Sequence, residues 1–329
     1  MQNFKAVTYD RHGPPSEVLQ VREMSVAAPQ PGQVLIRMRT APINPVDLNV
    51  IEGKYPVRPP LPAVGGVEGV GEIAAVGAEV ADWRIGDRVL VPHEFGSWRE
   101  RGVASAAGLI AVPSGLSIEQ AAMLKINPPT AWRMLHDFVE LKSGDWILQN
   151  AGNSAVGRAV IQIARACGWR TVNVVRRAEL VEELLGEGGD VVLLDEENLP
   201  KQVAEATGRA EIRLAFNAVG GDSAVRLANA LAPGGTLVTY GAMGRQPLKI
   251  PNGLLIFKDL RWRGFWITEW YRTATQESVK TMFNELLPLV ANGLLHAKVE
   301  KSYAIADALA GVEHAQRSRR SGKILLTFE

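Results

Sequence analysis

The chain has 329 residues, more than one hydrophobic core usually covers, so its length favours two domains. Its 36 basic and 35 acidic residues leave a net charge of +1, which gives no overall field for recruiting nucleic acid or an anionic membrane. The single cysteine, Cys167, excludes a disulfide within the chain and is expected to be a small buried residue. No apolar run is long enough to span a bilayer and the first residues lack a signal-peptide pattern, so we expect a soluble, cytoplasmic protein.

The N-terminal third has the pattern of a β-rich domain. Short alternating runs at residues 4–9 and 17–24, and a clear period-two stretch at 33–41, predict strands, and another strand is expected at 88–92. Glycines between Gly65 and Gly77 supply turns and bulges. Because no helix follows them, a structural role for these glycines is favoured over phosphate binding.

The character of the sequence changes at Ser117. Ser117 and Gln120 have the spacing of a capping box, and residues 118–141 carry helical periodicity interrupted by Pro128 and Pro129. We place the transition to a second domain here.

Residues 142–177 predict a strand, a tight turn, a helix and a second strand. In such a βαβ unit, backbone N–H groups at the helix N-terminus can hold a pyrophosphate, so a dinucleotide is the expected ligand. The usual G-x-G-x-x-G spacing falls on Gly152, Ser154 and Gly157, so the middle glycine is replaced by serine. Taken alone, this motif is a weak signal.

The second strand of this unit ends in Arg176 and Arg177, where an NAD-binding protein would carry a carboxylate for the ribose hydroxyl. Two guanidinium groups suit a 2′-phosphate, which they can bind bidentately. The alternative is a solvated basic pair. Directly after a βαβ turn the phosphate interpretation is favoured, and NADP(H) with it.

Strands and helices continue to alternate after this unit. The pattern predicts strands at 191–194, 214–218 and 236–240, and helices at 199–207 and 223–231, as in a doubly wound parallel sheet. A helix, a strand, a helix and a last strand then follow, at 276–291, 298–303, 305–316 and 323–328. We expect the last strands to rejoin the N-terminal domain, so the domains are 1–121 plus 266–329 (β-rich) and 122–265 (dinucleotide-binding), with the active site in the cleft between them.

Nearly the whole chain carries, in order, the segments INPVDLNVIEGKYP, LPAVGGVEGVG, NPPTAWRMLHDF, QNAGNSAVGRAVIQIA, RTVNVVRR, TLVTYGAMGRQP and LLIFKDLRWRGFWITEW. With them the sequence resembles the zinc-independent branch of the medium-chain dehydrogenase/reductase superfamily, and within it the trans-2-enoyl thioester reductases of the mitochondrial fatty-acid synthesis type. Quinone oxidoreductases share the fold and some motifs, such as NP-x-D at Asn44–Asp47. The resemblance implies an α/β fold, in which a Rossmann sheet is inserted into a β-rich, GroES-like catalytic domain. It implies no metal, since one cysteine cannot build the zinc sites of the alcohol dehydrogenases.

The resemblance also implies roles for individual residues. A tyrosine in the family's G-x-Y loop acts on the substrate, and Tyr55 matches it; from the residue alone, a loop aromatic covering apolar surface would be the ordinary interpretation. The implied cofactor contacts are Asn127, Asn153, Ser154, Ala155, Val156, Arg176, Arg177, Tyr240, Gly241, Ala242, Met243, Phe265, Trp266 and Lys323. After Tyr55 the sequence PVRPP departs from the family pattern: its prolines stiffen the loop, and Arg58 could meet a phosphate of coenzyme A or face water.

The implied reaction moves a hydride from NADPH to the β-carbon of a trans-2-enoyl thioester of coenzyme A or acyl carrier protein, and a proton to the α-carbon. Negative charge develops on the thioester oxygen, so the site needs hydrogen-bond donors there and exclusion of water. Tyr55 can donate to that oxygen or supply the proton. An NADPH:quinone oxidoreductase and a non-catalytic NADPH-binding protein are the alternatives.

Trp262, Trp266 and Trp270 lie in a strand-like stretch at the end of the predicted parallel sheet. Related enzymes often pair such edges, so a homodimer is expected, although a core or cofactor-facing role fits these tryptophans equally well.

Overall fold

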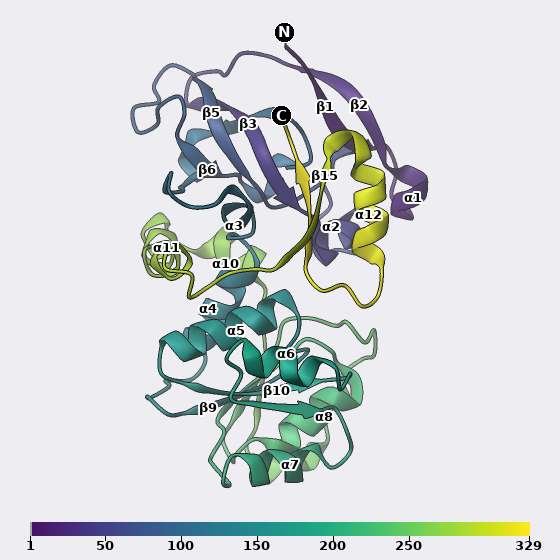
Figure 1. Cartoon of the computed structure of the whole chain (residues 1–329), viewed down its shortest axis with the longest axis vertical. Helices are drawn as coiled ribbons and strands as arrows, with labels where there is room; N and C mark the ends of the chain where they lie inside the picture. Colours follow the sequence, from purple (N-terminus) through teal and green to yellow (C-terminus); the bar gives the residue numbers. More distant parts are fainter. Residues whose placement is uncertain (1) are drawn as a thin grey trace. The chain divides into compact units, whose positions relative to one another are not determined.

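The computed structural model describes residues 2–329 and divides into two compact units (Figure 1). Unit 1 comprises Met1–Ile126 and His296–Glu329, and unit 2 comprises Asn127–Leu295. These bounds differ from the domain limits expected from the sequence, 121/122 and 265/266. Residues 266–295 belong to unit 2 because helix α11 (Gln276–Ala291) packs on helix α4 (Asn127–Asp137).

Unit 1 is built on two sheets. One has the strand order β2-β1-β4, and the other has the order β15-β16-β3-β5-β6-β8, with β7 also paired to β3. The strands are β1 (Gln2–Tyr9), β2 (Gln20–Val26), β3 (Gln33–Pro42), β4 (Ala63–Val64), β5 (Val70–Val76), β6 (Arg88–Leu90), β7 (Arg101–Ser105), β8 (Ile110–Ala111), β15 (Val299–Ala304) and β16 (Lys323–Thr327). The helices are α1 (Pro15–Val18), α2 (Pro45–Ile51), α3 (Ile118–Ala122) and α12 (Ala308–Gln316).

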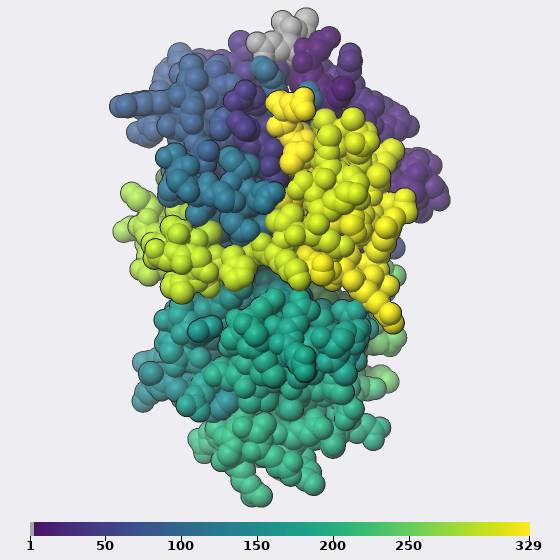
Figure 2. Space-filling model, in the orientation of Figure 1, coloured from purple at the N-terminus to yellow at the C-terminus, as the bar shows by residue number. Residues whose placement is uncertain are grey.

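The C-terminal strand completes the larger sheet of unit 1. β16 runs antiparallel to β3, with Leu326 opposite Ala41, and Figure 2 shows the yellow C-terminal residues packed beside the purple N-terminal ones. The expected return of the last strands to the N-terminal domain is therefore confirmed, and with it the insertion of one fold into the other.

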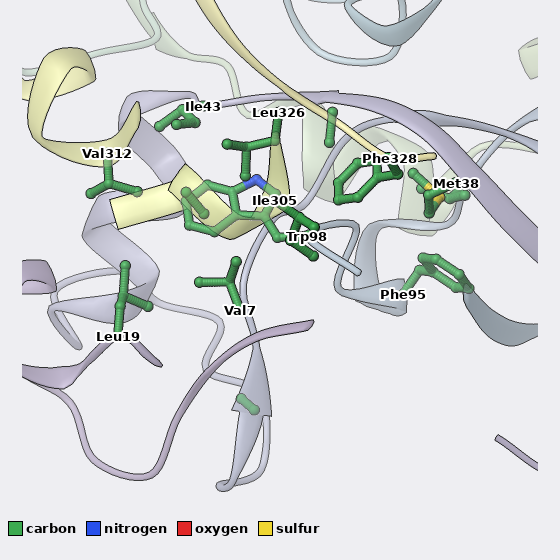
Figure 3. Close-up of a cluster of buried hydrophobic side chains, with 14 of the residues drawn as sticks. Val7, Leu19, Met38, Ile43, Phe95, Trp98, Ile305, Val312, Leu326 and Phe328 are labelled. Carbon is green, nitrogen blue, oxygen red and sulfur yellow. The ribbon is translucent and has the colours of Figure 1, made fainter. Parts of the chain in front are cut away.

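The core of unit 1 surrounds Trp98, which is fully buried among side chains that include Val7, Ile305 and Leu326 (Figure 3). Its ring lies directly on the backbone of Gly65 and Gly66: an added Cβ would lie 2.4 Å from the ring at Gly65 and 2.3 Å from it at Gly66. These glycines thus make room for a large aromatic side chain, the structural role that their sequence context favours.

Unit 2 is a doubly wound parallel sheet with the strand order β11-β10-β9-β12-β13-β14. Helices pack on both faces of this sheet through buried apolar side chains. One cluster includes residues of α7 and α8, and the other includes residues of α5 and α6. The strands are β9 (Trp146–Asn150), β10 (Arg170–Val175), β11 (Val191–Leu194), β12 (Leu214–Asn217), β13 (Thr236–Thr239) and β14 (Arg261–Gly264). The remaining helices are α5 (Ala155–Ala166), α6 (Leu180–Gly186), α7 (Leu199–Ala206), α8 (Gly221–Ala230), α9 (Asn252–Ile256) and α10 (Ile267–Thr273).

The expectation of one strand through all three late tryptophans is wrong. Trp262 lies on β14, but Trp266 is the N-cap residue of α10 and Trp270 lies within that helix. The chain turns into a helix there because Ile267 is buried and Arg133 of α4 stacks on Trp270, with its guanidinium carbon 4.7 Å from a ring centroid. Cys167, expected to be buried, is only half-buried because it follows the last turn of α5.

Replacing Gly66 by alanine is expected to destabilise unit 1 more than replacing Gly86. Both glycines have positive φ (+86° and +94°), which costs an alanine about 1–2 kcal/mol. Only at Gly66 does the new Cβ also meet Trp98, which adds about 1–3 kcal/mol of overpacking, whereas nothing lies within 4 Å of the new atom at Gly86. Urea unfolding of the Gly66→Ala and Gly86→Ala variants measures the difference, and equal losses would contradict the packing role.

Candidate active site

The polar groups of unit 2 collect where β9 and β12 end. Neighbouring strands on either side of this point connect in opposite directions, and such a switch point is where doubly wound sheets bind ligands. Asn150, the last residue of β9, donates from Nδ2 to Asn217 Oδ1 and to Ser223 Oγ, both at 2.9 Å. Its Oδ1 accepts from the N–H of Ala218 at 2.7 Å. One buried amide therefore holds the ends of both strands.

The turn after β9 shows why its glycine fingerprint is incomplete. Ser154 is the N-cap residue of α5, and its Oγ accepts from the N–H of Gly157 at 3.0 Å. Ala151 adopts a left-handed φ of +49°, a conformation in which glycine is favoured. At Gly157 an added Cβ would lie 2.5 Å from the carbonyl oxygen of Gly152, so a side chain there would clash with the backbone of the turn.

Two buried polar atoms of unit 2 fit a polar ligand. Asn127 Nδ2 and the Tyr240 hydroxyl make no regular hydrogen bond among the described residues. Burial raises the pKa of Tyr240 to about 12, although the nearby Ser154 hydroxyl opposes the shift. Since buried donors without partners are costly, a bound group that pairs with them would stabilise this site.

The basic pair lies beside the turn. The N–H of Gly152 donates to the Val174 carbonyl at 3.2 Å, which ties the turn to the end of β10 just before Arg176. Arg176 is exposed, and no ion pair joins it to another residue in the described part of the chain. Arg177 Nη1 lies 3.5 Å from Glu179 Oε1. The geometry leaves Arg176 open to an anionic ligand.

The loops after β12 and β13 are joined through their backbones. The N–H of Met243 donates to the Ala218 carbonyl at 2.8 Å, and that of Gly244 to the Val219 carbonyl at 2.9 Å. An added Cβ at Gly241 would lie 3.0 Å from the Ala218 oxygen. Because parallel strands end at one edge, the predicted residues 153–156, 176–177, 240–243 and 265–266 all follow strands at the carboxyl edge of this sheet.

Tyr55 and Lys323 belong to unit 1. Tyr55 is half-buried in the loop after α2, where the N–H of Lys54 closes the helix by donating to the Asn49 carbonyl. Lys323 is buried, and its ammonium donates to Asn44 Oδ1. Burial lowers the pKa of Lys323, while Glu68 and Asp47 oppose that change. Both residues stay predictions as substrate or cofactor contacts.

Lys323 is part of a buried polar network that the sequence did not predict. Asn44 Nδ2 donates to Glu68 Oε2 at 2.8 Å, and Glu68 Oε1 accepts from the N–H groups of Lys125 and Ile126 at 2.7 and 2.8 Å. Burial raises the pKa of Asp47 to about 7, despite the N–H groups of Asn44 and Val67 that its carboxylate accepts. The sequence signal that could have indicated this network is Glu68, a charged residue within the glycine-rich stretch.

Residues 2–329 contain neither a metal-binding cluster nor a membrane-spanning helix. No group of three or more His, Cys, Asp or Glu side chains there could hold a metal ion. No helix in that part of the chain is long and apolar enough to cross a membrane.

Two family models match the chain. The "Alcohol dehydrogenase GroES-like domain" matches residues 30–117, and the "Zinc-binding dehydrogenase" model matches residues 155–287. A GroES-like β domain joined to a Rossmann sheet is the make-up of the medium-chain dehydrogenases and reductases, and the observed fold agrees with it.

Individual relatives narrow this class. The mitochondrial enoyl-acyl-carrier-protein reductase of Rattus norvegicus is 41% identical over 332 residues, 99% of this chain and 89% of the relative. The complex of Etr1p with NADP and crotonyl-CoA superposes with a TM-score of 0.91 at 30% identity over 100% of both chains. The chain belongs to the family of mitochondrial-type enoyl-acyl-carrier-protein reductases.

Other solved structures share the fold. The mitochondrial 2-enoyl thioester reductase heterodimer of Candida tropicalis, Etr1p/Etr2p, gives a TM-score of 0.90 at 31% identity over 100% of both chains. A mycobacterial quinone oxidoreductase gives 0.88 at 27% identity over 98% of this chain and 99% of that one. A "putative NADPH:quinone reductase" from Bacillus thuringiensis gives 0.93 at 31% identity over 100% of both chains. The fold is thus common to both activities, and the identity of 41% belongs to the enoyl-acyl-carrier-protein reductase of Rattus norvegicus.

Proposed function

We propose that this protein reduces the 2,3 double bond of a trans-2-enoyl thioester with NADPH. The main observation behind this proposal is the similarity, over nearly the whole chain, to enoyl reductases, among them one solved with NADP and crotonyl-CoA. Unit 2 supports it, because the buried Asn127 Nδ2 has no hydrogen-bond partner among the described residues and is free to pair with a polar ligand group. Quinone reduction is the second candidate, and the comparisons do not favour it.

NADPH would be held by the carboxyl edge of unit 2. The turn residues Asn153, Ser154, Ala155 and Val156 would meet the pyrophosphate at the start of α5, whose dipole favours negative charge. Arg176 and Arg177 would meet the 2′-phosphate, and the other predicted contacts are Asn127, Tyr240, Gly241, Ala242, Met243, Phe265, Trp266 and Lys323. When bound, NADPH supplies the hydride that reduces the substrate β-carbon.

Tyr55 is the residue we assign to the substrate. Its phenol can donate a hydrogen bond to the thioester oxygen, where negative charge develops, or deliver the proton that the α-carbon takes up. Either role needs the hydroxyl and not the ring. The prolines that follow, Pro56, Pro59 and Pro60, restrict the backbone of this loop and so reduce the entropy lost when it is ordered against a substrate.

A Tyr55→Phe variant is expected to lose about 10²-fold or more in kcat with crotonyl-CoA, because the ring remains but the donor is gone. The NADPH dissociation constant should stay unchanged. Loss of NADPH absorbance measures turnover, and cofactor fluorescence measures binding.

The wild-type protein, assayed with crotonyl-CoA and a benzoquinone, provides the reference. Turnover of the quinone without turnover of crotonyl-CoA would reject the proposed substrate class, and cofactor binding without either activity would favour a non-catalytic protein. A Tyr55→Phe variant with full kcat would remove only the assignment of this residue.

Replacing Arg176 by alanine should raise KM for NADPH about tenfold or more and leave KM for NADH unchanged, since a hydrogen bond to a charged group contributes about 1.5–3 kcal/mol. Steady-state kinetics with both cofactors measure the change. Arg165→Ala is the matched control, because it removes the same charge from the last turn of α5, the end opposite the turn. An equal effect on NADPH and NADH would contradict recognition of the 2′-phosphate.

We also propose that the protein forms a homodimer through the β14 edge of unit 2. Within the described residues β14 pairs only with β13, so its other edge is open. Ile256 and Phe257, which lie shortly before this strand, are 70% and 86% exposed, an unusual state for large apolar side chains. The heterodimer of the Candida tropicalis reductases supports an assembly of this kind.

A Phe257→Glu variant is expected to shift the dimer to monomer, because a charge would be buried in the interface. Sedimentation velocity over a range of concentrations measures the shift. Ile85→Glu, at a 69% exposed apolar residue of unit 1, is the control that should leave the assembly unchanged. A Phe257→Glu protein that sediments as the wild type does would reject this interface.

The cytoplasmic location expected from the sequence stays a prediction, since the relatives are named mitochondrial.

A further inference from the structure

A continuous chain of hydrogen bonds crosses the interior of unit 1. The Lys323 ammonium donates to Asn44 Oδ1, Asn44 Nδ2 donates to Glu68 Oε2, and Glu68 Oε1 accepts from the N–H groups of Lys125 and Ile126. The three side chains are at least nine-tenths buried, with exposures of 8%, 2% and 0%. None of the chemistry assigned above uses Asn44 or Glu68.

This chain can run in only one direction. Donors stand at both ends: an ammonium on one side and two backbone N–H groups on the other. As a carboxylate Glu68 only accepts, so the Asn44 amide presents its oxygen to Lys323 and its nitrogen to Glu68. If that amide were turned over, its nitrogen would face the Lys323 ammonium, which is also a donor. Its oxygen would face the Glu68 carboxylate, which is also an acceptor.

The chain connects two segments that matter for the proposed reaction. Asn44 immediately precedes α2, and its N–H donates to Asp47 Oδ2 at 2.6 Å; α2 leads into the loop of Tyr55. At the other end, Ile126 immediately precedes Asn127, whose buried Nδ2 has no hydrogen-bond partner among the described residues. Glu68 therefore bonds both to the start of one segment and to the start of the other.

We propose that Glu68 is a positioning residue of the reductase: it fixes the Tyr55 segment through Asn44 and the Asn127 segment through the N–H groups of Lys125 and Ile126. The inference rests on the proposed function, which supplies the roles of Tyr55 and Asn127. It gives a reason for charged groups in this interior, because buried charged groups are often no more stabilising than well-packed apolar residues of similar volume.

The hydrogen-bond directions give a test by exchange. In Glu68→Gln, the amide oxygen can keep the two backbone N–H groups, but its Nε2 then faces Asn44 Nδ2. In Asn44→Asp, the new carboxylate can accept from Lys323 but faces the carboxylate of Glu68. In the double variant, the amide introduced at position 68 would donate to the carboxylate introduced at position 44. That carboxylate also accepts from Lys323, and the number of charges is that of the wild type.

We expect each single variant to lower kcat/KM for crotonyl-CoA about tenfold or more and to weaken NADPH binding at least about fivefold, because small displacements of reacting groups are costly. The double variant should return both values to within about threefold of the wild type. Glu72→Gln is the control: Glu72 pairs with Arg37 and Arg39 in the same unit but lies outside the chain, so both values should stay unchanged.

The NADPH binding measurement separates this inference from the proposed function, since it needs no turnover. If the wild type fails to reduce crotonyl-CoA but the binding losses and their recovery occur, the substrate assignment fails and the positioning of Asn127 stands. Single variants with the kcat/KM and NADPH binding of the wild type would overturn the inference. So would a double variant whose losses equal the sum of the losses in the single variants. If a single variant does not fold, the double variant alone decides, because it must fold and bind NADPH as the wild type does.

Discussion

The ligand edge of unit 2 depends on the buried amide of Asn150. This side chain uses both of its donors and its acceptor, on Asn217, Ser223 and Ala218. It thereby joins the ends of two strands whose connections leave the sheet in opposite directions. Through the Asn217 backbone the same cluster reaches Tyr240, whose N–H donates to the Asn217 carbonyl at 3.0 Å. The loops that would hold a dinucleotide are therefore fixed before a ligand binds, as is usual for cofactor sites.

Much of the fold could be predicted because its information is local. The strands of the parallel sheet are short β-branched runs separated by helical periodicity, and residues 191–194 and 276–291 were predicted with the observed bounds. The late tryptophans were misassigned because their helix forms through packing of Arg133 on Trp270, which no local pattern records. The same holds for the limit between the units, which depends on α11 packing on α4.

For the candidate site too, local sequence patterns could be recognised, whereas contacts between residues far apart in the chain could not. The predicted cofactor contacts at 153–156, 176–177, 240–243 and 265–266 follow parallel strands that share one edge, and their role stays a prediction. The Lys323, Asn44 and Glu68 chain was not foreseen, because it brings together residues separated by up to 279 positions. Ser117 and Gln120 are an intermediate case. The Ser117 Oγ accepts from the Gln120 N–H at 3.2 Å as their spacing predicts, but the Gln120 side chain pairs with the backbone of Ala297 instead of completing the capping box.

The pairing of β16 with β3 also sets the order in which the chain can fold during synthesis. Unit 2 is one continuous stretch, Asn127–Leu295, so all of its strands are available once that stretch has been made. Unit 1 must wait for Lys323–Thr327, which supplies a central strand of its larger sheet, the partner of Asn44 and part of the core around Trp98. Domains generally fold as units as they are completed. Until Lys323–Thr327 have been made, then, a complete unit 2 follows an N-terminal β segment in which residues Thr40–Pro42 of β3 still lack their partner strand β16.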